Sequence, residues 1–113
     1  MYKVVFNITS VKQLESFIFK YKKTFLDIYD DTGLFNEKII RDNYIEVGDR
    51  LYGFIRERAV KILSDDTVLG TKDLDGKGKA LFYSIRNYSI YLEYSENKIL
   101  KERTVKNFIF YKK

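Results

Sequence analysis

Apolar and polar residues follow a helical period through most of the first half of the chain. After Ser10, apolar residues recur every three or four positions, at Leu14, Phe17, Ile18, Tyr21, Phe25 and Ile28. Ser10 and Gln13 have the spacing of a capping box, and Asp30, Asp31 and Gly33 end the pattern. This stretch therefore predicts an amphipathic helix that packs one face against a core.

A second apolar stripe follows Asn36, a residue suited to capping a helix. The stripe passes through Ile40, Tyr44, Val47, Leu51, Phe54 or Ile55, and Ile62. Gly48 and Gly53 interrupt it, and each costs about 1 kcal/mol relative to alanine inside a helix. An alternative places a hairpin turn at Gly48 between strands at 43–47 and 50–55. The stripe favours a second helix.

Runs of aromatic and β-branched residues predict strands at both ends of the chain. One precedes the helices, at residues 2–8, and three follow them, at Ala80–Ile85, Tyr88–Tyr94 and Ile99–Phe110. Arg86 and Asn87 form a two-residue turn in which we expect Asn87 to take a positive φ. The expected fold is a single α+β domain over residues 1–113, with an N-terminal strand, a helical hairpin, and a three-stranded antiparallel sheet packed against the helices.

The charge of the chain is distributed unevenly. From Lys77 to the end there are nine Lys or Arg and three Glu, whereas the first 76 residues hold twelve basic and thirteen acidic residues. The net charge of +5 therefore comes from the predicted sheet. Such a surface favours an acidic partner, most commonly nucleic acid. The alternative is that the charge only keeps the protein from aggregating.

Composition limits the available chemistry. The chain has neither cysteine nor histidine, which excludes thiolate sites, imidazole metal ligands and the usual acid–base residue at neutral pH. The acidic pairs at 30–31 and 65–66 fit helix ends better than a metal site, so we expect no metal and no cofactor. The N-terminus lacks a signal-peptide pattern, and no apolar run is long enough to span a bilayer. We expect a cytoplasmic protein with no membrane partner.

Several segments resemble the RelE/ParE toxins of type II toxin–antitoxin systems. They are the Leu69-Gly70 exit from the helices, the lysine- and glycine-rich loop at 72–79, the Ser-Ile-Arg at 84–86, residues 88–94, and an ending rich in basic and aromatic residues. The resemblance implies the order strand, helical hairpin, antiparallel strands. It also implies a cognate antitoxin as partner. RelE-type members cut mRNA in the ribosomal decoding site without a metal, and ParE-type members poison DNA gyrase.

The same resemblance assigns six candidate catalytic residues: Lys77, Lys79, Arg86, Arg103, Lys106 and Tyr111. The two lysines resemble those that RelE-type enzymes place near the scissile phosphate, and the late basic pair resembles a cluster on the last strand. The terminal tyrosine resembles one that stacks on a base or assists proton transfer. Cleavage through a ribose 2′-hydroxyl needs a base, an acid and cations for the phosphorane, roles that Lys, Arg and Tyr could divide here.

The first hypothesis is therefore a ribosome-dependent, metal-independent mRNA endoribonuclease whose partners are an antitoxin, the ribosome and mRNA. One residue departs from the family pattern, because Ser89 follows Tyr88 where RelE-type enzymes commonly carry arginine. This departure leaves open a ParE-like gyrase inhibitor without nuclease activity. A non-catalytic basic nucleic-acid-binding module is the third alternative, and its affinity should fall steeply with salt.

Overall fold

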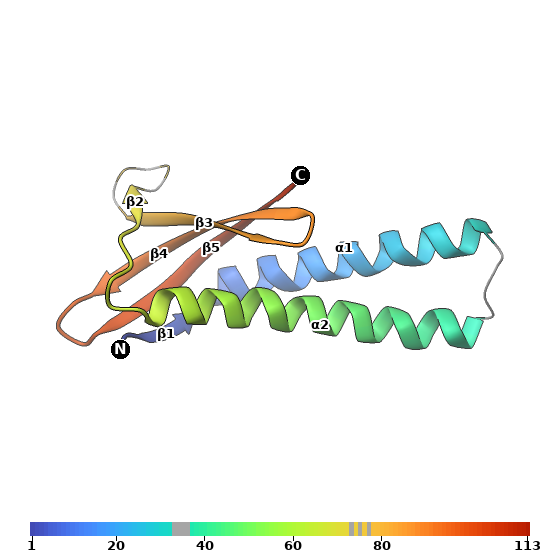
Figure 1. Cartoon of the computed structure of the whole chain (residues 1–113), viewed down its shortest axis with the longest axis horizontal. Helices are drawn as coiled ribbons and strands as arrows, with labels where there is room; N and C mark the ends of the chain where they lie inside the picture. Colours follow the sequence, from blue (N-terminus) through green and yellow to red (C-terminus); the bar gives the residue numbers. More distant parts are fainter. Residues whose placement is uncertain (33–36, 73, 75, 77) are drawn as a thin grey trace.

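The computed structural model describes residues 1–32, 37–72, 74, 76 and 78–113, with the side chains of 25–26, 28–32 and 37–45 outside the description. Two long helices and five strands follow one another along the chain (Figure 1). Their bounds are β1 Lys3–Phe6, α1 Ile8–Thr32, α2 Glu37–Ser64, β2 Thr71–Lys72, β3 Lys79–Ile85, β4 Tyr88–Asn97 and β5 Glu102–Lys112. The α+β class is confirmed. The predicted helix cap at Asn36 lies outside the described residues.

The strands form one five-stranded mixed sheet in the order β1-β5-β4-β3-β2. The prediction of a three-stranded antiparallel sheet was wrong, because β1 joins the sheet beside β5 and the two-residue β2 extends the other edge. β1 runs parallel to β5, with Val4 opposite Arg103. A parallel pair needs a long crossover, and the helical hairpin between β1 and the later strands supplies it.

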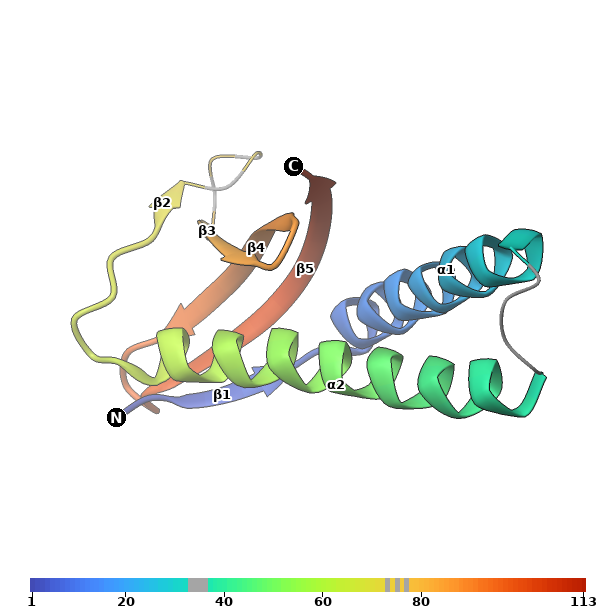
Figure 2. The ribbon, with the colours of Figure 1, turned by 45° about the vertical axis from the view of Figure 1, so that its right-hand side comes forward.

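Both helices lie on the same face of this sheet (Figures 1 and 2). The core between the layers is built from Leu14, Ile18, Leu51, Ile55, Ala59, Leu63, Ile90, Leu92, Val105 and Phe108. On β4 every second residue contributes to this core, namely Ile90, Leu92 and Tyr94. No described helix covers the opposite face of the sheet.

α2 is continuous through both of its glycines, so the alternative with a hairpin turn at Gly48 was wrong. The apolar stripe decides this outcome, because Leu51, Ile55 and Ala59 are buried at successive turns of the helix. Their burial outweighs the helix-propensity cost of the two glycines.

α1 begins earlier than the predicted capping box. The Asn7 side chain accepts a hydrogen bond from the Ser10 backbone N–H at 2.8 Å, which makes Asn7 the N-cap. Gln13 instead contacts β5, where its Oε1 accepts the Phe108 backbone N–H at 2.7 Å and its Nε2 donates to Asn107 at 3.1 Å. Gln13 therefore ties α1 to the sheet.

The hairpin of α1 and α2 extends well beyond the sheet (Figure 2). The molecule is 55 Å along its longest axis, and its radius of gyration is 16.5 Å. A compact domain of this length has a radius of about 13 Å. Only the half of each helix that lies nearest the sheet packs on the strands. None of the described helices is both long and apolar enough to cross a membrane.

Candidate nucleic-acid interface

The residues assigned by the family resemblance do not converge on one point. Lys79 begins β3 and Arg86 follows its end, which places them about 20 Å apart along an extended strand. Lys77 lies outside the described residues. The remaining three residues are all on β5. The described candidate residues therefore lie in different surroundings.

Arg103 is buried, with 1% of its surface exposed. Its Nη1 donates hydrogen bonds to the backbone oxygens of Leu63 and Asp65, both at 2.7 Å, at the end of α2. Its Nε donates to Glu96 Oε1 at 2.9 Å, and its guanidinium lies 3.8 Å from the ring centroid of Tyr2. A cation at a helix C-terminus satisfies free carbonyls and opposes the helix dipole. Arg103 is thus a structural residue, sealed away from a substrate.

Lys79 belongs to the same cluster, because its Nζ lies 2.9 Å from the other oxygen of Glu96. The hydrogen bond from Lys79 is the main cause that lowers the pKa of Glu96, and Arg103 adds to it. One carboxylate therefore neutralises much of the charge of two cations that the family resemblance assigned to catalysis. The sequence contains Glu96, but nothing local marks it as their partner.

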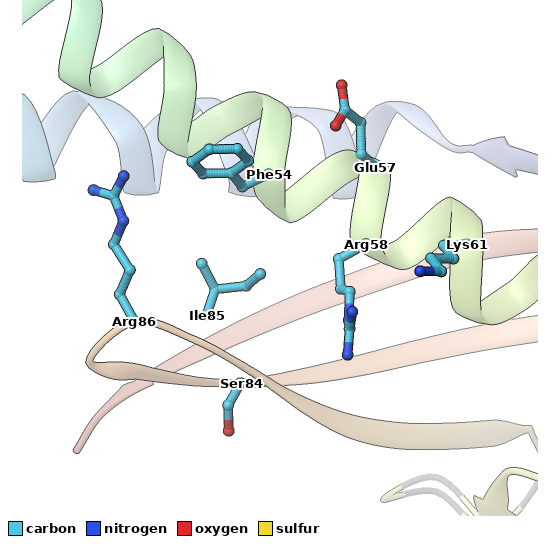
Figure 3. Close-up of a pocket in the computed structure, with 7 residues that line it drawn as sticks. All are labelled: Phe54, Glu57, Arg58, Lys61, Ser84, Ile85 and Arg86. Atoms are coloured by element: carbon cyan, nitrogen blue, oxygen red, sulfur yellow. The ribbon is translucent and has the colours of Figure 1, made fainter.

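A separate groove lies between α2 and the turn that joins β3 to β4 (Figure 3). We call it the basic groove; its volume is about 540 Å³ and it is lined by Phe54, Glu57, Arg58, Lys61, Ser84, Ile85 and Arg86. Arg58 extends from the helix toward the strands, whereas the Glu57 carboxylate points away from them (Figure 3). The groove therefore has an apolar floor and a cationic rim.

The three cations of the basic groove are not neutralised within the described part of the chain. Neither Arg58, Lys61 nor Arg86 makes an ion pair with a described carboxylate. The Arg86 guanidinium lies 5.6 Å from the ring centroid of Phe54, a cation–π contact that leaves its charge in place. Three cations that face one open groove can bind the oxygens of a phosphate backbone.

The backbone at Arg86 is held in an uncommon conformation. Its φ is +52°, in the left-handed region that side chains other than glycine rarely adopt. Asn87, for which the positive φ was predicted, is not among the residues that show it. Strained backbone persists where the surrounding structure imposes it, and it is frequent at functional sites. Here the turn directs the Arg86 side chain toward α2 (Figure 3).

Sequence reasoning found Arg86 but missed the helix residues of the basic groove. Phe54, Arg58 and Lys61 are spaced by four and three residues, so they occupy one helix face. That spacing was visible in the sequence. However, these cations do not stand out by charge, because acidic residues balance basic ones over the first 76 positions.

The two other assigned residues lie further along β5. Lys106 is left between the pairs Glu93–Asn107 and Tyr94–Val105, so it is the extra residue of a β-bulge. Tyr111 is 49% exposed and lies at the same end of the sheet as Arg86, because the Lys113 N–H donates to the Asn87 carbonyl at 2.7 Å. Tyr111 is therefore the member of the β5 set that lies closest to the basic groove in the fold.

The described residues also constrain proton transfer and metal binding. Burial raises the pKa of Tyr83, whose hydroxyl donates a hydrogen bond to the Ile55 carbonyl at 3.0 Å, so this tyrosine is not a base. In the part of the chain that the structure describes, no three carboxylates gather where they could hold a metal ion.

Comparison with protein-family models, with curated proteins and with solved structures finds no match to this chain. The resemblance to RelE/ParE toxins therefore depends on the sequence segments named above. The geometry of the basic groove stands independently of that resemblance.

Proposed function

We propose that this chain is the toxin of a type II toxin–antitoxin pair and acts as a ribosome-dependent, metal-independent mRNA endoribonuclease. The observation that carries the proposal is the basic groove, where Arg58, Lys61 and Arg86 remain without a described carboxylate partner. An RNA backbone supplies the missing negative charge. The ribosome and mRNA are then the partners during action, in the cytoplasm, and an antitoxin keeps the toxin inactive.

The chemistry of the basic groove suits cleavage through a 2′-hydroxyl. Two guanidinium groups, from Arg58 and Arg86, would bind the non-bridging oxygens and stabilise the negative charge of the phosphorane. Lys61 lines the same groove and would add a third cation beside the phosphate. In this proposal the ribosome contributes by holding the mRNA in a reactive geometry, since positioning supplies a large part of such rate enhancements.

The order of elements supports the same assignment. The chain runs from one strand through two helices to four further strands, of which β3, β4 and β5 pair antiparallel. Of the sequence segments that carry the resemblance, residues 84–86 line the basic groove and residues 88–94 lie on the neighbouring strand β4. Ser84, Ile85 and Arg86 form one wall of the groove.

A ParE-like gyrase inhibitor is the second candidate, and a specific observation favours it. Arg103 is buried and Lys79 is paired with Glu96, so two of the cations expected to act on RNA hold the fold together instead. A toxin that only binds a protein target needs no catalytic cluster. The basic groove would then contact an acidic surface of gyrase.

The test is to add the purified protein to a cell-free translation reaction and to map mRNA 5′ ends by primer extension. We expect new ends within codons that appear only while ribosomes engage the message. Intact mRNA would overturn the nuclease, and a gyrase supercoiling assay on the same preparation would then decide for or against the second candidate. Steep salt-dependent RNA binding with neither activity would indicate the non-catalytic module.

A further inference from the structure

The sheet face that carries no helix presents a cluster of aromatic rings. Phe82 on β3 is 62% exposed and Tyr111 on β5 is 49% exposed. The Phe82 ring centroid lies 5.0 Å from that of Tyr91 on β4 and 6.4 Å from that of Tyr111. Large apolar side chains exposed together on a sheet face indicate a binding surface.

The register of the strands explains how Phe82 and Tyr111 meet. Phe82, Tyr91 and Ile109 form one row across the sheet, and Ser84, Ser89 and Tyr111 form the next. β4 separates β3 from β5, which places their backbones about 9.5 Å apart. Ser84 and Ser89 have small side chains, which leave space over β4 on this face of the sheet. The Tyr111 ring can therefore lean across β4 toward Phe82.

This aromatic face continues into the basic groove. Ser84 lines the groove, while its hydroxyl points away from α2 (Figure 3). Phe82 is two residues earlier on β3 and therefore lies on the same side of the sheet as Ser84. The β3–β4 turn with Arg86 and the C-terminal lysines of β5 lie at the same end of the sheet, because Lys112 pairs with Tyr88. A nucleic-acid strand that leaves the basic groove around this turn would therefore reach Phe82 next.

We propose that Phe82 is a stacking platform for the bases of single-stranded RNA whose phosphates lie in the basic groove. This inference rests on the proposed RNA substrate and names how the substrate is held. Stacking on an exposed ring is available to every base, so the platform contributes affinity without sequence preference.

The experiment measures the affinity of the purified protein for a fluorescently labelled hexauridine oligonucleotide. Phe82→Leu should weaken binding about tenfold, the size of one lost base stack, and Phe82→Trp should restore it. The matched control is Phe19→Leu, because Phe19 on α1 is 66% exposed and lies outside the platform. That control should bind the oligonucleotide as the wild type does.

Salt dependence separates stacking from charge. Phe82→Leu should leave the slope of log affinity against log salt unchanged, since no phosphate contact is removed. Arg58→Ala should reduce the magnitude of that slope by about 0.7, the value for one phosphate contact on a single strand. A Phe82→Leu variant that changes the slope and not the affinity at low salt would overturn the proposal.

Three further outcomes would also overturn the platform. The first is that the wild type does not bind the oligonucleotide. The second is that Phe82→Leu binds it as tightly as the wild type does. The third is that Phe82→Leu changes the oligomeric state measured by sedimentation but leaves RNA binding unchanged. The last would make this face a contact between copies of the chain. Failure of the proposed nuclease can be told apart from failure of the platform. If mRNA stays intact during translation but RNA binding still depends on Phe82, the nuclease proposal is rejected and the platform is retained.

Discussion

Arg103 and Glu96 lie directly opposite each other on β5 and β4, and their side chains form an ion pair at 2.9 Å. Both side chains are almost completely buried, at 2% and 6% exposure. Arg103 also caps the end of α2 through two carbonyls, so the pair joins the sheet to the helical layer. A charge pair in this position stabilises the fold only as long as both partners are present.

Removing Arg103 should therefore destabilise the protein. Arg103→Met keeps most of the side-chain volume but leaves Glu96 buried without this partner and frees two carbonyls, at a cost of about 3 kcal/mol. Urea denaturation of the purified variant measures this loss. A loss below about 1 kcal/mol would contradict the structural role. If the expected loss of stability is measured, any relief of growth arrest by Arg103→Ala would report misfolding rather than lost catalysis.

The same cluster should make stability depend on pH. Because Lys79 and Arg103 hold the pKa of Glu96 below its ordinary value of 4.5, its contribution is fully present above that pH and is lost as the pH falls through the folded-state value. Denaturation midpoints at neutral and acidic pH measure the effect in the wild type and in Glu96→Gln. The variant should lose less stability on acidification. Equal losses in the two proteins would contradict the assignment.

Two glycines should respond oppositely to alanine. A Cβ at Gly70 would lie 2.4 Å from the Tyr94 hydroxyl and 3.1 Å from the Ala80 carbonyl, so Gly70→Ala should cost about 2 kcal/mol. Gly53 lies inside α2 with nothing within 4 Å of such a Cβ, so Gly53→Ala should stabilise by up to about 1 kcal/mol. Thermal denaturation of both variants is the measurement. Equal shifts of Tm would show that the approach of Tyr94 to Gly70 is not tight.

Arg86→Gly should separate stability from function. Glycine relieves the positive φ at this turn, so we expect a Tm equal to or above that of the wild type, while the basic groove loses one cation and toxicity falls. Growth arrest on induced expression measures toxicity.

Lys101→Gly is the matched control for this variant. Lys101 has a φ of +49° and precedes β5, outside the groove. It should show the same change in Tm with full toxicity. Full toxicity of Arg86→Gly would argue against the groove as the active surface.

A cation on α2 provides the second functional test. Arg58→Ala should lower toxicity at least tenfold at constant expression, because the groove then lacks a phosphate ligand on its helix side. Arg50→Ala is the control, since Arg50 is an exposed residue on the same helix that pairs with Glu46. Loss of toxicity in both variants, or in neither, would not fit a localised site.

The amino-acid sequence by itself determined which segments are helical and which are extended. Helical spacing of apolar residues predicted α1 and α2 even across Gly48 and Gly53, and runs of aromatic and β-branched residues predicted β1, β3, β4 and β5. These features are local, because hydrophobic periodicity reports the burial of one element at a time. The positive charge of the last third was equally readable.

Only the tertiary structure decided what each cation does. Arg103 is sealed because residues of α2 forty positions earlier present their carbonyls to it, and Lys79 is neutralised because β3 and β4 pair in the register that delivers Glu96. Arg86 gains Arg58 as a neighbour because α2 packs beside the β3–β4 turn. Such contacts join positions far apart in the chain, and their distances follow from packing and strand register, which local patterns do not encode.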